Sequence, residues 1–250
     1  YFATKYFGGK MNFIFSEIIS GVIGAIVGGI VTAIFTNRKS IRTRLKSWWI
    51  GNKKIRMSIS YLFSIRDDEG NYLLIKGNRI QQYQPIGGVY KYFKSFQPIK
   101  SKLEVTDEIN KNFYDPDDLR IYLPGKNLMK LIEWFKTGEN RETVITREFI
   151  EEIIAPGLLN ITDLENIDFE YIHRKESGLR FSDHFEKEEY LIYDVFKVSF
   201  SKEVLARLKE NSEKNPNFLW VSQADIDTKN TYIEEQAIQI GEHAKYITTC

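Results

Sequence analysis

Residues 138–153 read GENRETVITREFIEEI, and this stretch carries more chemistry per residue than any other part of the chain. At about 100° per residue, a helix here places its apolar side chains on one side, namely Ile145, Phe149, Ile150 and Ile153. The carboxylates of Glu148, Glu151 and Glu152 share another side. We therefore expect one face of this helix to pack against a core and the other to bind a ligand.

Three carboxylates on one helix face repel one another unless water or a cation lies among them. Oxygen ligands of this kind suit Mg²⁺ or Mn²⁺, so a hard divalent cation is one way to stabilise Glu148, Glu151 and Glu152. Arg147 lies four residues before Glu151, and we expect it to orient one of the carboxylates. A solvated charged helix face would show the same letters, so this prediction needs support from the rest of the chain.

The stretch resembles the Nudix box, G-x5-E-x7-R-E-U-x-E-E-x-G-U, in which U is aliphatic or aromatic. The matching residues are Glu139, Arg147, Glu148, Phe149, Glu151 and Glu152. Upstream, the segment Pro85-Ile86-Gly87-Gly88 is similar to the glycine pair that opens the box.

The chain departs from this pattern in two places. Fifty residues separate Gly88 from Glu139 where the pattern has five, which implies an insertion at about residues 91–135. Ile154 replaces the final glycine of the box, and Pro156-Gly157 follows it. The helix must therefore end differently, while the glutamates of the box are kept.

The resemblance implies an α/β fold, a Nudix-like α/β/α sandwich with a mixed sheet, and attack of water on a phosphoanhydride of a nucleotide. It assigns the metal to Glu148, Glu151 and Glu152, the orienting role to Arg147, and contacts with the bound group to Gly87 and Gly88. The family often takes a general base from a later loop, where the candidates are Asp183, Glu186, Glu188 and Glu189. His184 in that loop is expected to be a surface residue.

A second informative stretch, IISGVIGAIVGGIVTAIF at Ile18–Phe35, holds eighteen residues without a charge. A helix of about 20 residues crosses the hydrocarbon core of a bilayer, and four glycines here would make a poor water-soluble helix. The sequence therefore predicts an N-terminal tail at 1–12 and a transmembrane helix at 13–36. Gly24 and Gly28 have the spacing that lets two such helices approach closely, so we expect a homo-oligomer in the lipid bilayer.

Charge is divided unevenly along the chain. Residues 1–56 carry ten Lys and Arg against one Glu, whereas the remainder carries 33 acidic and 25 basic residues. The basic residues after the apolar stretch predict a juxtamembrane linker at 37–54, near the headgroups at Trp48 and Trp49, and a cytoplasmic C-terminal domain at 55–250. The acidic domain disfavours binding to a nucleic-acid duplex. A single cysteine, Cys250, excludes a disulfide-stapled scaffold.

Hydrophobic patterning predicts mixed strands and helices in the C-terminal domain. We expect a β-hairpin of residues 56–65 and 72–76, and further strands at 81–84, 103–105, 119–123, 168–173, 190–200 and 218–221. Helices are expected at 126–137, 140–154 with Asn140 as N-cap, 202–211 and 232–245. Four aromatic residues either stack on a base or fill the core, namely Tyr83, Tyr90, Tyr92 and Phe93.

The architecture resembles the membrane-anchored Nudix proteins associated with bacterial anti-phage nucleotidyltransferase operons, the CD-NTase-associated or SMODS-associated Nudix group. This resemblance implies an effector at the inner membrane that senses or processes a nucleotide or cyclic oligonucleotide second messenger, with an oligomerising transmembrane helix. One alternative is a membrane-tethered, Mg-dependent nucleoside-diphosphate-linked pyrophosphohydrolase. Another is a membrane scaffold in which residues 138–153 are only charged surface.

Overall fold

A twelve-residue strand, β1 (Lys54–Ile65), lies at the centre of the computed structural model, which describes residues 38–77, 81–108, 117–233 and 236–248. The other strands are β2 (Tyr72–Lys76), β3 (Tyr83–Pro85), β4 (Gly87–Val89), β5 (Thr106–Asp107), β6 (Arg120–Pro124), β7 (Ile167–Glu176), β8 (Arg180–Ser182), β9 (Lys187–Phe200), β10 (Phe218–Val221), β11 (Asn230–Ile233) and β12 (Gln236–Gln239). The α-helices are α2 (Arg38–Ile50), α3 (Gln97–Lys102), α4 (Leu128–Thr137), α5 (Thr146–Phe149), α6 (Lys202–Glu213) and α7 (Gln223–Thr228). Shorter turns are η1 (Lys94–Phe96), η2 (Gly125–Asn127), the π-helical η3 (Ile150–Ile154), η4 (Ile161–Asn166) and η5 (Glu242–Tyr246).

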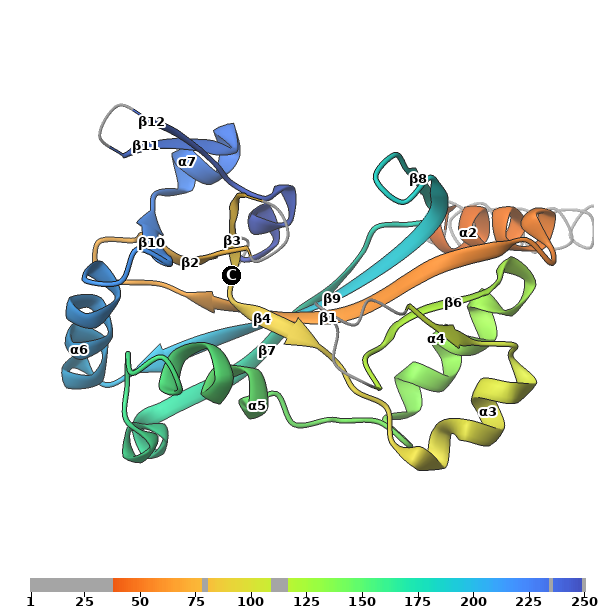
Figure 1. Cartoon of the computed structure of the whole chain (residues 1–250), viewed down its shortest axis with the longest axis horizontal. Helices are drawn as coiled ribbons and strands as arrows, with labels where there is room; N and C mark the ends of the chain where they lie inside the picture. Colours follow the sequence, from red (N-terminus) through yellow and green to blue (C-terminus); the bar gives the residue numbers. More distant parts are fainter. Residues whose placement is uncertain (1–37, 78–80, 109–116, 234–235, 249–250) are drawn as a thin grey trace, which may run out of the picture.

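The larger sheet has seven strands in the order β5-β6-β1-β9-β7, with β4 added to β1 and β8 added to β9 (Figure 1). The two long strands β1 and β9 pair in parallel from Arg56 opposite Glu189 to Ile65 opposite Val198. The other pairings in this sheet are antiparallel. The predicted mixed α/β fold is therefore confirmed.

The two faces of this sheet are covered differently, because successive side chains of β1 point to opposite faces. Its odd-numbered residues from Ile55 to Ile65 join the main core with α4, α5 and α6. On the other face, Leu62 and Val195 join a second cluster with the three-stranded sheet β10-β2-β3, α7 and η5. The second covering layer is thus a small sheet with short helices.

The helix α2 falls inside the segment that we expected to be a linker at 37–54, and it is fixed to the domain. The Ser47 hydroxyl donates to the Gly125 carbonyl at 2.6 Å, and the Lys46 ammonium contacts Glu188 at 2.7 Å and the Leu179 carbonyl at 3.1 Å. Among the described residues, no helix is long and apolar enough to cross a membrane. The predicted tail at 1–12 and transmembrane helix at 13–36 lie outside the described residues.

The expected insertion is a folded unit that leaves and re-enters the domain at one point. Phe93 N–H donates to the Asn140 carbonyl and Glu142 N–H donates to the Lys91 carbonyl, both at 2.8 Å, and Tyr92 forms a bridge with Arg141. Between these residues, β6 extends the sheet beside β1, and α4 covers the main core. The unit is therefore part of the fold rather than a loop.

Four sequence-based expectations were wrong in detail. Strands β1 and β2 do not form a hairpin: they belong to different sheets, because β9 on one side and β6 and β4 on the other occupy both edges of β1. Residues 103–105 follow α3 as a turn, and the strand there is β5. The helix expected from Asn140 begins at Thr146, and the helix expected at 232–245 is instead the hairpin β11–β12 followed by η5. The strands expected at 119–123, 190–200 and 218–221 are confirmed as β6, β9 and β10.

Phe149 joins α5 to the sheet, since its fully buried ring lies edge-on to Phe63 at 5.8 Å and to Phe169 at 5.2 Å. Replacing Phe149 with Ala should lower the free energy of unfolding by about 3–5 kcal/mol, because a cavity remains under α5. Urea unfolding of the full chain in detergent measures this change. The control Phe181→Ala alters a ring that is 57% exposed and should change stability by less than about 0.5 kcal/mol. Equal effects of the two substitutions would contradict this account of the core.

Candidate functional site

The short helix α5 continues into the π-helical turn η3, in which Ala155 N–H donates to the Ile150 carbonyl at 2.7 Å. Such turns are rare and occur often at functional sites. Phe149 and Ile153 face the core, while Glu148 and Glu152 are half-buried and Glu151 is exposed. The predicted division of this segment into a packing face and an acidic face is therefore confirmed.

The two glycines of β4 lie directly against this acidic segment. A Cβ atom on Gly88 would fall 2.0–2.3 Å from the carboxyl end of Glu148, so the glycine leaves the space that this side chain occupies. A Cβ atom on Gly87 would fall 2.1 Å from the Tyr61 carbonyl oxygen of β1. Both positions need glycine because of close approach, and Gly88 brings the sheet and the acidic helix together.

The guanidinium of Arg147 connects the carboxylates of the site. Its Nε donates to Glu142 at 3.0 Å, and its Nη1 donates to Glu148 at 2.8 Å and to Glu151 at 3.1 Å. Its Nη2 donates to the Val89 carbonyl at 3.2 Å, which ties it to β4. Arg147 therefore contacts the Glu148 carboxylate directly, which is the geometry that an orienting residue needs.

Two of the three glutamates have perturbed pKa values. Burial raises the pKa of Glu148 to about 7, where the attraction of Arg147 is opposed by repulsion from Glu151 and Glu152. Burial, with repulsion from Glu151, also raises the pKa of Glu152. These shifts mean that negative charge is unfavourable here without a further cation, which is typical of functional sites.

Sequence reasoning missed Tyr61, which lies under the site. Its hydroxyl is buried and has no hydrogen-bond partner among the described residues. Burial and the negative charge of Glu148 raise its pKa, while Arg147 acts in the opposite direction. A buried hydroxyl left without a partner marks a place where a water molecule or ligand atom would be stabilised. Its role depends on its register opposite Gly88, which the amino-acid pattern does not reveal.

Glu139 matches the first glutamate of the box, but a different carboxylate lies beside Arg147. Glu139 is exposed in the loop after α4, whereas the carboxylate that Arg147 contacts is that of Glu142. The return of the inserted unit at Arg141 explains the difference, because it fixes Glu142 beside Lys91 and β4. The seven-residue spacing before Arg147 selected Glu139, and this spacing could not show the contact between Glu142 and Lys91.

The site has the donors of a metal centre without a converged set of ligands. Within the described ranges, no group of three or more His, Cys, Asp or Glu is placed to hold a metal ion. Glu148 and Glu152 still fit a hard divalent cation, because they are half-buried oxygen donors with raised pKa values, next to the unpartnered Tyr61 hydroxyl. Glu151 is 50% exposed and held on Arg147, so it would have to leave this contact to join them.

The carboxylates proposed as general bases belong to the β8–β9 hairpin, which lies apart from α5 in Figure 1. Glu188 is paired with Lys46, and Glu189 is buried between Arg56 and Arg180. His184 is exposed, as expected, and its ring contacts Phe185. The aromatic residues Tyr83, Tyr90 and Tyr92 are buried in the core, while Phe93 is 53% exposed.

A second charged group, also missed from the sequence, lies on the same face of the sheet. Arg174 donates to Asp194 through two nitrogens at 2.6 and 2.9 Å, and the Tyr90 hydroxyl donates to the same carboxylate at 3.0 Å. Arg141 donates to the backbone carbonyls of Phe135 and Glu142. The rings of Tyr90 and Tyr61 are 4.8 Å apart, so this group adjoins the tyrosine that lies under the site.

The raised pKa of Glu148 predicts a pH-dependent stability. In metal-free protein, the unfolded state loses this proton near pH 4.5 and the folded state near pH 7, so wild type loses stability as pH rises between these values. The stability of Glu148→Gln relative to wild type should therefore rise by up to about 3 kcal/mol from pH 4.5 to 8. Urea unfolding of the full chain in EDTA measures it.

The matched control is Glu139→Gln, whose stability relative to wild type should stay the same at each pH. Adding Mg²⁺ at pH 8 should reduce the difference in free energy of unfolding between wild type and Glu148→Gln, because a cation stabilises the charged form of the Glu148 carboxylate. A difference that does not vary with pH would contradict the assigned environment of Glu148.

Comparison with known proteins identifies the family. Residues 54–248 match the SMODS-associated NUDIX domain. A comparison with curated proteins gave no match. The matched region begins at β1 and includes α5, β4 and η5, so it spans the sheet and the carboxylate site described above. Because this match covers more than half of its residues, the chain belongs to the SMODS-associated NUDIX domain family.

Proposed function

We propose that this chain is a membrane-anchored effector whose domain senses or processes a nucleotide second messenger in bacterial anti-phage signalling. Family membership suggests a CD-NTase-associated Nudix effector and implies a nucleotide-related ligand. The observation that carries the proposal is the acidic cluster of Glu148, Glu151 and Glu152, in which Arg147 contacts Glu148 and Glu151, and Glu148 lies against Gly88. Its negative charge is stabilised when a divalent cation joins it to the phosphates of a nucleotide.

The residues around the cluster fit a phosphorylated ligand. Glu148 and Glu152 would hold Mg²⁺ or Mn²⁺, and Arg147 fixes the direction of the Glu148 carboxylate. Arg141, which donates to backbone carbonyls, places positive charge nearby, and arginine suits phosphate recognition because its donors form a planar fork. A bound cation would neutralise charge on the phosphates and activate water. The acidic cluster itself supports a small nucleotide ligand in preference to a duplex, whose backbone it would repel.

A second candidate function, pyrophosphohydrolysis of a nucleoside-diphosphate-linked substrate, uses the same residues. It is favoured by the raised pKa of Glu148, because a carboxyl that titrates near neutral pH is suited to proton transfer. The contact of Glu151 with Arg147 favours the sensing function, since it removes one ligand from the metal. The two functions predict different effects of glutamate substitutions on turnover and on nucleotide affinity.

Substituting the glutamates separates these functions. The full chain in detergent, with Mg²⁺ and a panel of nucleotides, is compared with Glu151→Gln and Glu152→Gln. A hydrolase should lose turnover by orders of magnitude while folding persists, because each change removes a charged ligand with little change of shape. A sensor should show slow or no turnover in every form, with weaker nucleotide affinity in the variants.

The exposed residue Glu139 supplies the control, because Glu139→Gln removes a carboxylate of the same chain segment outside the cluster. It should leave turnover and affinity unchanged. Hydrolysis and binding that are unaffected by both Glu151→Gln and Glu152→Gln would reject the carboxylate site and both functions built on it.

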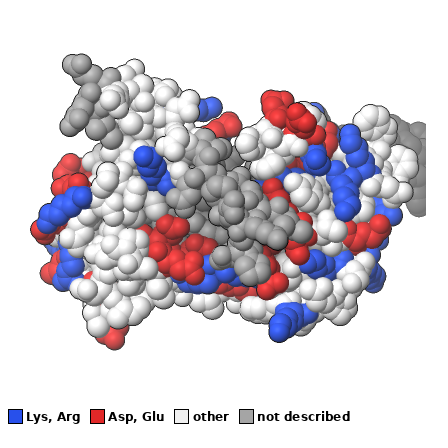
Figure 2. Space-filling view, in the orientation of Figure 1, with Lys and Arg blue, Asp and Glu red and all other residues white. Residues whose placement is uncertain are grey.

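The membrane part of the proposal is supported by the surface of α2. This helix follows directly on the apolar stretch Ile18–Phe35 and presents an apolar stripe to solvent, with exposed fractions of 36% at Ile41, 63% at Leu45, 78% at Trp48 and 82% at Trp49. Arg38, Lys39 and Arg42 are exposed beside it, and basic atoms gather at the α2 end in Figure 2. Tryptophan and basic residues together suit the interface of an anionic bilayer.

Lipid quenching tests this placement of α2. The full chain is reconstituted in nanodiscs whose anionic lipids carry bromine on their acyl chains. Trp48 and Trp49 should be quenched because they enter the interface, whereas Trp134 is only 8% exposed and should keep its emission. The double variant Trp48→Phe, Trp49→Phe should lose the quenched component. Quenching that is absent, or that persists in the double variant, would place α2 away from the bilayer.

A further inference from the structure

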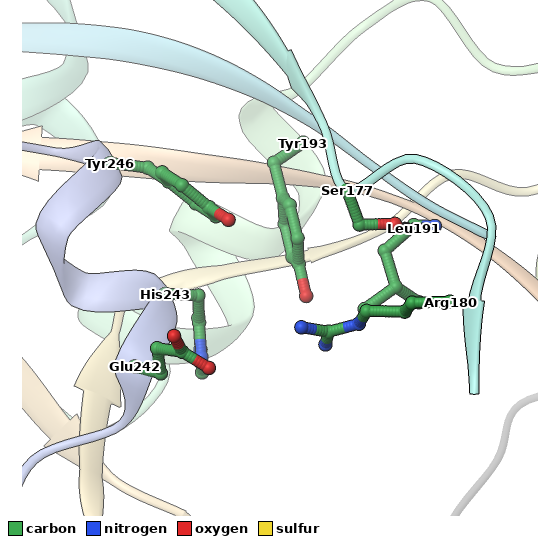
Figure 3. A pocket seen from close by; sticks show the side chains of 7 residues that line it. All are labelled: Ser177, Arg180, Leu191, Tyr193, Glu242, His243 and Tyr246. Carbon is green, nitrogen blue, oxygen red and sulfur yellow. Dashed lines mark hydrogen bonds between the residues drawn. The ribbon is translucent and has the colours of Figure 1, made fainter. Parts of the chain in front are cut away.

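A pocket on the opposite face of the central sheet has no part in the site described above. It lies between the β8–β9 hairpin and η5, and Figure 3 shows the side chains around it, namely those of Arg180, Tyr193, Glu242, His243 and Tyr246. Neighbouring residues of β9 explain the separation. Asp194 faces Tyr90 on the carboxylate side, so Tyr193 faces the other side.

The walls of the pocket are aromatic. The rings of Tyr193 and His243 are nearly parallel, with an interplanar angle of 10° and centroids 5.8 Å apart, and the ring of Tyr246 lies 5.4 Å from that of Tyr193. Burial lowers the pKa of His243 to about 4, so this ring is neutral at neutral pH. Neutral aromatic faces stack on planar heteroaromatic groups, and such stacking stabilises bound bases by about 1–3 kcal/mol each.

Two charged side chains at the pocket have complementary hydrogen-bonding ability. Arg180 uses Nε and Nη2 to contact Glu189, at 3.2 and 3.1 Å, and its guanidinium extends toward Tyr193 and His243 (Figure 3). Glu242 is 54% exposed, and contacts with Lys245 and Lys229 keep its pKa below the usual value. The Nη1 side of Arg180 thus lies on one side of the pocket, and the ionised Glu242, which surface lysines also contact, lies on the other.

We propose that this pocket binds the base of a guanine nucleotide, at a place distinct from the carboxylate cluster. Guanine carries two acceptors, O6 and N7, which suit Arg180, and its N1–H and N2–H₂ donors suit a carboxylate such as Glu242. The pocket encloses about 50 Å³ of accessible space and opens to solvent, so it is smaller than sites that enclose a whole ligand. It would therefore take the edge of a base, with the ribose and phosphates directed outward. This inference rests on the proposed nucleotide-binding function.

Titration of the full chain in detergent with GMP, in EDTA, tests the proposal. GMP has no phosphoanhydride, and EDTA removes the metal that the carboxylate cluster would need. Wild type should bind GMP, and at least tenfold more tightly than AMP. Arg180→Gln and Glu242→Gln should each weaken GMP binding at least tenfold, measured by calorimetry. Glu242 lies at the surface, so this second variant should keep the melting temperature of wild type.

Two control variants show whether GMP binds at the pocket or at the carboxylate cluster. Arg66→Gln changes an exposed arginine that lies over Tyr72, and Glu152→Gln changes the carboxylate cluster; both should leave the Kd for GMP unchanged. Absence of GMP binding, equal affinity for AMP, or loss of binding only in Glu152→Gln would overturn the pocket assignment. The last of these results would leave the proposed function of the carboxylates intact. Loss of GMP binding in Arg180→Gln and Glu242→Gln, with no nucleotide response to substitutions at Glu151 and Glu152, would support the pocket and reject that function.

Discussion

The parallel pairing of β1 with β9 is the constraint on which the rest of the structure depends. Ten consecutive residues of β1 are in register with β9, from Arg56 to Ile65. Because side chains alternate across a sheet, this register decides for every residue of both strands which face it occupies. It places Tyr61 under the acidic helix and Tyr193 in the pocket on the opposite side. A shift of one residue between the two strands would turn the side chains of one strand to the opposite face. The residues of each site would then no longer lie together.

On the acidic side of this sheet, Arg147 determines the electrostatics of the carboxylate cluster. One guanidinium contacts Glu142, Glu148 and Glu151, and it is anchored to the backbone of β4 through Val89. An external cation must therefore compete with an internal one for the same oxygen atoms. Glu152 has no such contact with Arg147 among the described residues, so it is the glutamate whose charge is compensated least.

Local patterns predicted local structure well. The helical spacing of Leu128, Leu131, Ile132 and Phe135 gave α4, and the apolar run at 190–200 gave most of β9, because both follow from which side chains must be buried. The acidic face of α5 and η3 was predicted in the same way, because the apolar residues of this segment must be buried and leave the glutamates on the other side. The choice of strand partners is not local, which is why the β1–β2 hairpin was wrong.

The missed site residues have the same physical origin. Glu142 and Tyr61 are brought to the site by contacts between segments far apart in the sequence. Glu142 bonds to Lys91, and Tyr61 lies opposite Gly88 in the sheet. The helix expected at 232–245 was wrong because the apparent periodicity there belongs to two short antiparallel strands. The motif showed that Glu148, Glu151 and Glu152 lie on one short segment, whereas the contact of Glu142 with Arg147 depends on the return of the chain beside Lys91.

The hairpin of β8 and β9 links two surfaces that the sheet otherwise separates. Its Arg180 lines the pocket, while the adjacent Leu179 carbonyl and Glu188 contact Lys46 of α2. A ligand that binds more tightly to one position of this hairpin would also stabilise the corresponding position of α2. By thermodynamic reciprocity, contacts that hold α2 in that position would strengthen binding of the ligand. A change in the position of α2 would therefore reach Arg180 through the hairpin that carries both contacts.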